Sequence, residues 1–418
     1  MSAIYILYFL LSPIIFLCLI ILRLFNKKIR GRPLFMTFDG INEINSIVKK
    51  KLDKPIILHA ASAGEFEQVM PLLRERPKEI STIFTFFSPT VYWQKKDPNL
   101  FDELCFHPFD FPWTAYIFFK KIQPSKYIIN RHDIWPHHIF FAKKFNVKII
   151  FINANLKKDS PRLKPRFKGF HNWLFKQIDT IIVPSNEIKD RFIKNFEIKN
   201  ILVYKDTRFK QIQYRINQKK GIRGLNYLSN KATIILGSID KKDWEIILKS
   251  IKKNRPENYN LIIVPHEIDQ GFIHQIIQDI EELSLSINRI TDICKNSNYD
   301  LADTDSEEVE NFELDCIVYD KVGDLLDIYR YGSLAYVGCG FTSGVHNVVE
   351  AALQGCYVAY GPNINLLDEA IQLKESELSK IIYNSNDFSD FANISDAKFL
   401  EENKNKVLEL FKDYENDF

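Results

Sequence analysis

Residues 55–75 read PIILHAASAGEFEQVMPLLRE, and the pattern changes twice within this stretch. The first six residues, PIILHA, are almost continuously apolar, which is typical of a strand buried on both faces of a parallel sheet. A glycine turn follows, and residues 65–75 have the character of a helix. Strand, turn and helix in this order predict an α/β domain.

The same unit recurs along the chain. Further buried strands are predicted at 82–86, 127–129, 147–152, 180–183 and 201–203, with helices at 136–145 and 187–195 among them. After a polar connection at 213–231, a second series has strands at 233–236, 260–264, 315–318, 334–337 and 357–360, and helices at 242–253, 345–353 and 366–374. The two series predict doubly wound, Rossmann-like domains at 31–215 and 216–418 that face a ligand cleft, and the last helix can pack back on the first domain.

The composition is that of a globular protein and excludes disordered, collagenous and fibrous classes. Of the 418 residues, 46% are apolar and 26% charged, with only 15 Gly and 17 Pro. The six cysteines contain no C-x-x-C pair, which argues against a disulfide scaffold or structural zinc and favours a reducing compartment. The net charge of +3 hides a basic half at 1–215, with 36 Lys and Arg against 18 acids. Such a half can face nucleic acid, an anionic membrane or a phosphorylated substrate.

The N-terminus favours the membrane. Residues 3–22 are apolar except for Ser12, and 20 such residues can cross a hydrocarbon core as a helix. Basic residues follow this segment from Arg23 onward and none precedes it. The positive-inside rule therefore predicts a single-pass anchor at 1–30, not a cleaved signal peptide, with the remainder in the cytoplasm. Pro13 leaves the alternative of a segment that lies in the interface.

The turn after the first strand has a structural and a chemical interpretation. Ser62 and Glu65 have the spacing of a capping box, and taken by themselves they favour that role. Glu65 would also stand at the carboxyl edge of the sheet, where it can act as a general base for an acceptor hydroxyl. Because a helix N-terminus lowers the pKa of a carboxylate, such a base is expected to need burial.

Two basic stretches of the first half leave similar alternatives open. In RHDIWP, at 131–136, the Trp-Pro pair starts a helix, so Asp133 either caps this helix or binds a polar acceptor beside Arg131. Residues 157–168, KKDSPRLKPRFK, hold six bases and one acid. They form either a solvated face or a docking site for an anionic surface or phosphate.

Residues 336–350, YVGCGFTSGVHNVVE, are the most informative stretch of the second half. A strand, a glycine loop and a helix N-terminus would form an anion site suited to a nucleotide phosphate. The stretch matches neither the P-loop nor the dinucleotide-binding fingerprint. His346 and Glu350 are expected on one helical face, and in the absence of a third ligand Glu350 is expected to bond to a ligand's sugar rather than to a metal.

Taken in order, these motifs resemble those of the bacterial Kdo transferases. These are membrane-anchored glycosyltransferases of GT-B architecture, which move 3-deoxy-manno-octulosonate (Kdo) from CMP-Kdo to a lipid A precursor. The resemblance extends from the anchor to about Pro362. It is carried by SAGE at 62–65, FDFP at 109–112, WP at 135–136, DTRF at 206–209, GS at 237–238, VPHE at 264–267, GDL at 323–325 with Tyr329, residues 338–350, and GP at 361–362.

The resemblance implies a direct, inverting displacement in which Glu65 is the general base and Asp133 a second catalytic residue. It implies no cofactor and no metal, lipid IVA as the acceptor, the bacterial inner membrane as the location, and no nucleic-acid partner. The acceptor is expected at Ser62, Gly64, Arg131, Lys157, Lys158 and Arg162. The cytidine monophosphate of the donor is expected at Gly237, Ser238, Pro265, His266, Gly323, Asp324, Gly338, Gly340, Asn347 and Glu350.

The chain also departs from the family pattern. It has Arg131-His132-Asp133 where many members have Glu-Thr-Glu, and Pro265-His266-Glu267 where many have Pro-Arg-His. The acceptor contacts and the number of sugars transferred therefore stay open. Two rival functions also remain, a GT-B transferase with another nucleotide sugar and a non-catalytic adaptor at the membrane surface.

Overall fold

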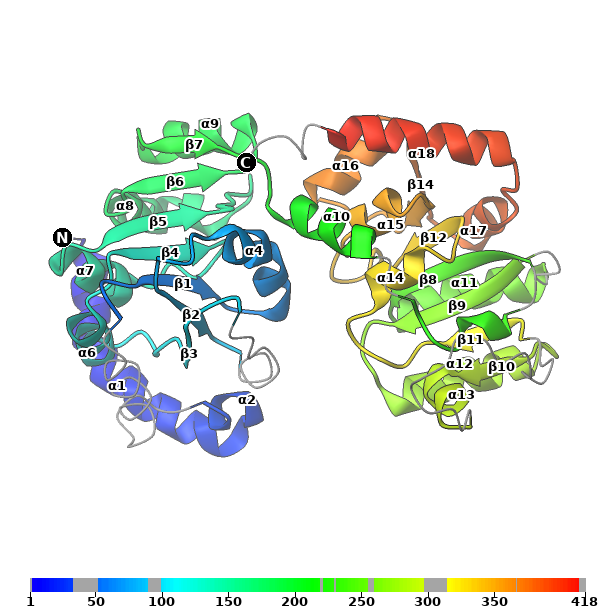
Figure 1. Cartoon of the computed structure of the whole chain (residues 1–418), viewed down its shortest axis with the longest axis horizontal. Helices are drawn as coiled ribbons and strands as arrows, with labels where there is room; N and C mark the ends of the chain where they lie inside the picture. Colours follow the sequence, from blue (N-terminus) through cyan, green and yellow to red (C-terminus); the bar gives the residue numbers. More distant parts are fainter. Residues whose placement is uncertain are drawn as a thin grey trace. The chain divides into compact units, whose positions relative to one another are not determined.

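The structure is a computed structural model of the chain, and it describes residues 2–32, 52–88, 99–218, 221–228, 231–254, 259–296, 314–365 and 367–412. The chain divides between Gln211 and Ile212 into two compact units, called here the N-terminal and the C-terminal unit. Each unit is built on one seven-stranded parallel sheet (Figure 1). The predicted class of two doubly wound α/β domains is confirmed.

The sheet of the N-terminal unit has the order β3-β2-β1-β4-β5-β6-β7. Its strands are β1 (Ile56–Ala60), β2 (Thr82–Phe86), β3 (Glu103–Phe106), β4 (Lys126–Asn130), β5 (Lys148–Ile152), β6 (Thr180–Val183) and β7 (Ile201–Val203). The helices are α4 (Ala63–Glu75), α6 (Pro112–Ile122), α7 (Pro136–Lys144), α8 (Pro165–Phe175) and α9 (Asn186–Phe196), and α10 (Arg208–Gln218) crosses the boundary between the units. The strand β3 and the helices α6, α8 and α10 were not predicted.

Both faces of this sheet are covered, which explains the continuous apolar runs of its strands. On one face, Leu58 and Phe84 pack with Phe66 and Val69 of α4. The neighbouring strand positions point to the opposite face, where the core is formed with α6, α7, α8 and α9. Because side chains alternate along β1, Leu58 points toward α4 and His59 points toward the opposite face of the sheet, which α6, α7, α8 and α9 cover.

The C-terminal unit repeats the plan with the order β10-β11-β9-β8-β12-β13-β14. Its strands are β8 (Ala232–Ile239), β9 (Tyr259–Pro265), β10 (Ile287–Arg289), β11 (Cys316–Val318), β12 (Leu334–Val337), β13 (Tyr357–Tyr360) and β14 (Ser379–Ile381). Its helices are α11 (Lys241–Lys253), α12 (Gln270–Glu281), α13 (Ile290–Asn296), α14 (Leu325–Tyr329), α15 (Val349–Leu353), α16 (Asp368–Glu375), α17 (Ser385–Ala392) and α18 (Ala397–Phe411). The last helix, α18, packs against α15 and β13 of this unit.

The helix predicted at 345–353 is shorter than expected, because α15 begins only at Val349. The preceding backbone is bonded to neighbouring loops instead of to itself. The N–H of Val345 donates to the carbonyl of Asn363, and the N–H of His346 donates to that of Gly338. These bonds tie residues 345 and 346 to neighbouring loops, and the segment before Val349 is not helical.

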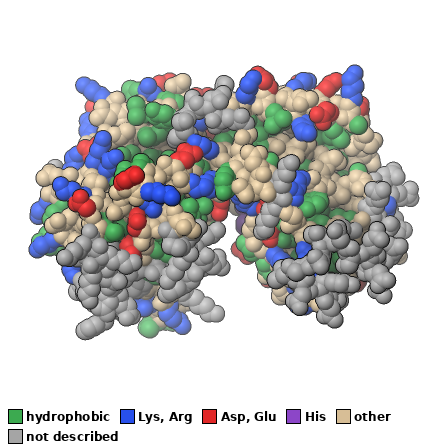
Figure 2. Space-filling model, in the orientation of Figure 1, with side chains coloured by type: hydrophobic (Ala, Val, Ile, Leu, Met, Phe, Trp, Pro, Cys, Tyr) green, Lys and Arg blue, Asp and Glu red, His purple; other side chains and the backbone are tan. Residues whose placement is uncertain are grey.

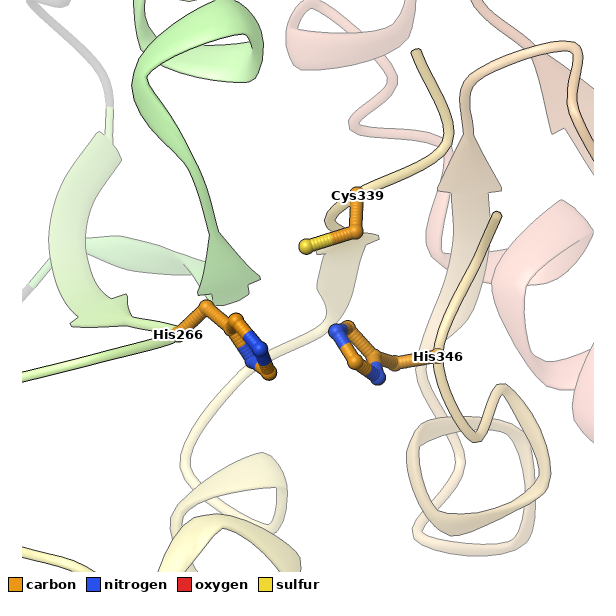
Figure 3. A group of neighbouring side chains, drawn as sticks. All are labelled: His266, Cys339 and His346. Carbon is orange, nitrogen blue, oxygen red and sulfur yellow. The ribbon is translucent and has the colours of Figure 1, made fainter. Parts of the chain in front are cut away.

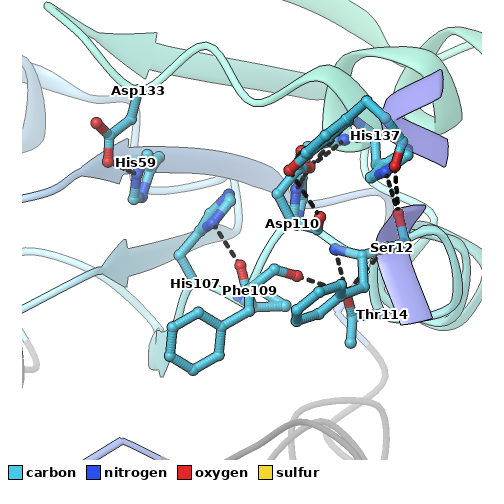
Figure 4. A network of polar contacts seen from close by, with 12 residues as sticks. Ser12, His59, His107, Phe109, Asp110, Thr114, Asp133 and His137 are labelled. Atoms are coloured by element: carbon cyan, nitrogen blue, oxygen red, sulfur yellow. Dashed lines mark hydrogen bonds and ion pairs between the residues drawn. The ribbon is translucent and has the colours of Figure 1, made fainter. Parts of the chain in front are cut away.

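The N-terminal segment forms α1 (Ala3–Phe25), followed by the short helix α2 (Lys27–Arg30). Within the described residues, α1 is the one helix long and apolar enough to cross a membrane. One side of α1 contacts the N-terminal unit through polar groups (Figure 4). The hydroxyl of Tyr5 lies 3.1 Å from Nδ1 of His137, that of Ser12 lies 3.1 Å from Nε2 of the same ring, and Tyr8 donates to Asp110 at 3.1 Å.

Asp110 is the centre of this contact and caps α7 from a distant part of the chain. Its carboxylate accepts the backbone N–H groups of His137 and His138, each at 3.1 Å, and lies 2.7 Å from Nδ1 of His138. Burial raises the pKa of Asp110, but the contacts with the two histidines outweigh it and lower that pKa overall. The alternative that Asp133 caps α7 is wrong, because the N-cap position is Trp135, which makes no side-chain cap bond.

Asp110→Asn is expected to lower the free energy of unfolding at pH 7 by about 2–3 kcal/mol, since hydrogen bonds to a buried charge are lost. Because the pKa of Asp110 is lowered in the folded state, its ionised carboxylate stabilises the fold at any pH above its pKa in the unfolded chain. This stabilisation is lost as the pH falls through the pKa in the folded state, so the difference in stability between Asp110→Asn and the parent should vanish in acid. Thermal unfolding in detergent measures both. Asp190→Asn, on the exposed side of α9, is the control and should change stability by less than about 0.5 kcal/mol. Equal stability of Asp110→Asn and the parent at pH 7 would contradict the capping role.

Candidate functional site

Glu65 lies in the first turn of α4, directly after β1, and it takes part in a cap. The N-cap residue Ser62 accepts the N–H of Glu65 at 3.4 Å, and Oε2 of Glu65 accepts the N–H of Ala61 at 2.8 Å. The prediction that Ser62 caps α4 is thus confirmed, but the bond from Glu65 back to the chain goes to Ala61, one residue before the N-cap, and not to Ser62 as in a capping box. Of the two carboxylate oxygens of Glu65, only Oε2 accepts a hydrogen bond from the described residues. Oε1 is therefore left for other partners.

Glu65 is only 9% exposed, and burial raises the pKa of its carboxyl group. The bond from Ala61 lowers the pKa and the charge of Asp133 raises it further, while His59 and Arg131 lower it. The net direction is upward, whereas the helix N-terminus alone predicts a lowered value, because desolvation is the largest of these effects. A raised pKa makes Glu65 a stronger base once it is ionised.

Asp133 lies beside Glu65 and is held by a histidine of β1. Its Oδ2 is 3.3 Å from Nε2 of His59 (Figure 4). The other ring nitrogen of His59 is 2.9 Å from Oγ1 of Thr85. Burial raises the pKa of Asp133, but the contact with His59 outweighs it, so that the pKa is lowered. The two candidate catalytic carboxyls thus have pKa values pushed in opposite directions, which is typical of pairs with different roles. His59 was not predicted as a site residue.

A buried network of amides holds α4 in place. Asp206 accepts from Nε2 of Gln68 at 2.7 Å, and Oε1 of Gln68 accepts from Asn130 at 2.9 Å. Asn130 also donates to the carbonyl of Glu65 at 3.3 Å and accepts from Asn153 at 2.8 Å. The ends of β4 and β5 are in this way bonded to the helix that carries Glu65, which restricts the positions open to its carboxylate.

The expected acceptor residues are only partly brought together. Arg131, in a left-handed conformation with φ 59°, follows β4 and lies close enough to Glu65 to lower its pKa. Arg162 donates to the carbonyl of His132 at 3.2 Å, so it belongs to the same neighbourhood. Lys157 is half-buried, whereas Lys158 is exposed. On the face shown in Figure 2, Lys and Arg side chains of the N-terminal unit are spread among other residues rather than gathered in one patch.

The turn at Ser62 and Gly64 is open. Both residues are exposed, and no described heavy atom lies within 4 Å of a Cβ added at Gly64. Packing within the unit therefore does not require glycine at this position.

In the C-terminal unit the expected donor residues all lie at or beyond the carboxyl edge of the sheet. They come from the ends of β8 and β9, from the loops that follow β11 and β12, and from the first turn of α15: Gly237, Ser238, Pro265, His266, Gly323, Asp324, Gly338, Gly340, Asn347 and Glu350. Three of the glycines permit close packing there. A Cβ at Gly237 would lie 2.0 Å from the hydroxyl of Tyr329, one at Gly338 would lie 2.3 Å from the carbonyl oxygen of Ser238, and one at Gly340 would lie 2.5 Å from the backbone of Gly361.

The polar residues of this edge are ordered by local bonds. Nδ2 of Asn347 donates to Glu350 at 3.0 Å, and Oδ1 of Asn347 accepts the N–H of Val349. Asp324 accepts from the hydroxyl of Tyr319 at 2.6 Å. The expectation that His346 and Glu350 share a helical face is wrong, since residue 346 precedes the helix.

Comparisons with known proteins agree with this architecture. Residues 39–211 match the family model of 3-deoxy-D-manno-octulosonic-acid transferase (kdotransferase). The 3-deoxy-D-manno-octulosonic acid transferase of Aquifex aeolicus is 29% identical over 326 residues, covering 77% of this chain and 79% of that protein. The protein of the same name from Rickettsia bellii is 26% identical over an alignment covering 97% of both chains.

Two solved structures show the fold at low sequence identity. A UDP-N-acetylglucosamine 2-epimerase superposes with a TM-score of 0.56 at 11% identity, covering 87% of this chain and 96% of its own. A glycosyltransferase from Rickettsia africae superposes with a TM-score of 0.52 at 12% identity, covering 87% and 97%. The fold is GT-B. The family match in the N-terminal unit and the relatives that span both units together support identification of the chain as a bacterial 3-deoxy-D-manno-octulosonic acid (Kdo) transferase, a glycosyltransferase.

Proposed function

We propose that the chain transfers Kdo from CMP-Kdo to a hydroxyl of a lipid A precursor of the lipid IVA type, in lipopolysaccharide synthesis. The observation that supports it most is Glu65, a buried carboxyl of raised pKa held at an open turn. A relative 26% identical along almost the whole chain bears the name of this activity.

In the proposed reaction Glu65 takes the proton of the acceptor hydroxyl. The hydroxyl oxygen then bonds to the anomeric carbon of Kdo, while the bond from that carbon to the phosphate oxygen of CMP breaks and CMP leaves with the electron pair. A single displacement of this kind inverts the anomeric configuration and requires no metal. Asp133 remains ionised beside Glu65, and its negative charge helps to keep the pKa of Glu65 raised.

The donor is assigned to the carboxyl edge of the C-terminal sheet, with the bonded pair Asn347 and Glu350 positioned for sugar hydroxyls. The acceptor is assigned to the turn at Ser62 and Gly64 and to Arg131, Arg162 and the 157–158 lysines. Their positive charge suits a phosphorylated lipid.

The proposed location is the cytoplasmic face of the inner membrane. The outward side chains of α1, among them Leu10, Leu17 and Leu24, are apolar and exposed, which suits contact with lipid. An anchor of this kind brings the enzyme to an acceptor that is itself a membrane lipid.

Glu65→Gln is expected to lower acceptor-dependent release of CMP from CMP-Kdo by about 10²–10⁴-fold, as for loss of a general base. Gln retains an oxygen for the N–H of Ala61, so folding and CMP binding should be unchanged. Glu75→Gln, at the other end of α4 in an exposed pair with Lys210, is the matched control and should keep full activity. Undiminished release by Glu65→Gln would overturn the assignment of the base. UDP binding in place of CMP would favour a different sugar nucleotide, and CMP binding without release would favour an adaptor.

Asp133→Asn is expected to move the acidic limb of the pH–rate profile to lower pH. The activity of the parent should fall as the pH drops through the raised pKa of Glu65, because a protonated carboxyl cannot accept the hydroxyl's proton. Removing the negative charge of Asp133 lowers that pKa, so the limb shifts even if the maximal rate also falls. The profile of kcat/KM between pH 4 and 9 measures the shift, and an unmoved limb would show that the two carboxyls are not coupled.

Gly64→Ala separates folding from acceptor binding. Gly64 lies inside α4 with open space around it, so alanine should leave stability unchanged or raise it by up to about 1 kcal/mol. A methyl group at the proposed acceptor turn should raise the KM for the lipid several-fold while CMP binding stays the same. Gly169→Ala is a matched control, since Gly169 is also a helical glycine, in α8, and also has open space around it. Identical kinetics of the two variants would remove the acceptor from this turn.

A further inference from the structure

Three potential metal ligands converge at the carboxyl edge of the C-terminal sheet. His266 directly follows β9, while Cys339 and His346 lie in the loop between β12 and α15. One ligand atom of each residue, two ring nitrogens and Sγ, lies within 4.8 Å of the other two. Figure 3 shows the thiol and the two imidazoles directed toward a common space. The sequence alone offered His346 no third ligand, because its partners come from another strand and from seven residues upstream.

Cys339 occupies a backbone position that favours glycine. Its φ of 63° is left-handed, which costs a residue with a Cβ about 1–2 kcal/mol. It stands between Gly338 and Gly340 and is nevertheless 2% exposed, with its N–H donated to Asp243 at 2.6 Å. A thiol is thus held at a strained position by a buried acid, and strain of this kind is typical of functional sites.

One ring nitrogen of His346, Nε2, is buried without a hydrogen-bond partner among the described residues. The ring stacks on that of His266, with centroids 4.4 Å apart and planes at 28°. Burial, and then the neighbouring imidazole of His266, lower the pKa of His346, which favours the neutral ring, and a neutral imidazole carries a lone pair on one nitrogen. An orphaned nitrogen costs free energy that a bound cation would recover.

We propose that His266, Cys339 and His346 form a site for a divalent cation of the Zn²⁺ class, which prefers thiolate and imidazole ligands. Bond lengths of about 2.0–2.3 Å require only modest side-chain rotation from the observed spacing. Three protein ligands leave one coordination position for water or an oxygen of an anionic ligand. The site does not rest on the proposed transfer reaction, which requires no metal.

The chemistry of the thiol gives the site a pH dependence. Burial, together with the charges of Asp240 and Asp243, raises the pKa of Cys339 to about 12. The Sγ–H proton must therefore pass to solvent as the sulfur–metal bond forms, so one proton is released per cation bound. Affinity should therefore rise with pH. The same two acids place negative charge beside the site, which favours a cation.

The test is titration of the full, detergent-solubilised chain, without an affinity tag, with Co²⁺ and then Zn²⁺. One equivalent of Co²⁺ should produce a thiolate-to-metal charge-transfer band and tetrahedral d–d bands, and Zn²⁺ should displace it. Cys339→Gly should abolish the charge-transfer band and weaken Zn²⁺ binding by more than the 10–100-fold typical of outer-shell changes. Because glycine relaxes the left-handed backbone, this variant should fold at least as stably as the parent.

Two further variants complete the design. His346→Ala should weaken Zn²⁺ binding although the thiol of Cys339 is still present. Cys294→Ala, which removes another thiol of the same unit, should bind Zn²⁺ as the parent does. Absence of a thiolate band in the parent, or unchanged Zn²⁺ affinity in Cys339→Gly, would overturn the proposal. Neither CMP-Kdo nor a lipid is present in these titrations, so their outcome is independent of the test of Glu65.

Discussion

Every paired strand in the two sheets runs parallel to its neighbours, and the rest of the structure depends on this constraint. A parallel strand must be followed by a crossover before the chain can re-enter the sheet, so helices cover both faces and the carboxyl ends gather along one edge. Glu65, Asp133 and Asn153 meet at such an edge although 88 residues separate the first from the last. The close contacts between glycine loops in the C-terminal unit follow from the same geometry.

The parallel architecture could be predicted because its strands are buried on both faces. The runs at β2, β6, β7, β12 and β13 are mostly apolar, and their bounds agree with the prediction. The strands that were missed, β3, β10 and β14, lie at the outer positions of the sheets and carry charged residues. The helix expected at 345–353 was overestimated because tertiary hydrogen bonds, which local sequence does not report, tie residues 345 and 346 to neighbouring loops.

The candidate site was predictable where its geometry is local and unpredictable where it is not. Ser62 and Glu65 are three residues apart, and their spacing alone indicated both the cap and the carboxylate at the sheet edge. Asp110 and His59 have no such signal. Asp110 caps a helix that begins 26 residues later, and His59 reads as one polar residue in a buried strand. The upward direction of the pKa of Glu65 depends on how much protein surrounds it, which a sequence motif does not specify.

The polar side of α1 makes this helix more than a tether. Tyr5, Tyr8 and Ser12 lie at successive turns and bond to two residues of the N-terminal unit, so the helix cannot spin about its axis without breaking all three contacts. An apolar helix joined through a flexible linker would let the globular part take any orientation at a membrane surface. Here these bonds fix the rotation of α1 about its axis relative to the rest of the N-terminal unit, so with α1 in a membrane, as proposed, this unit would present one constant side to the lipid.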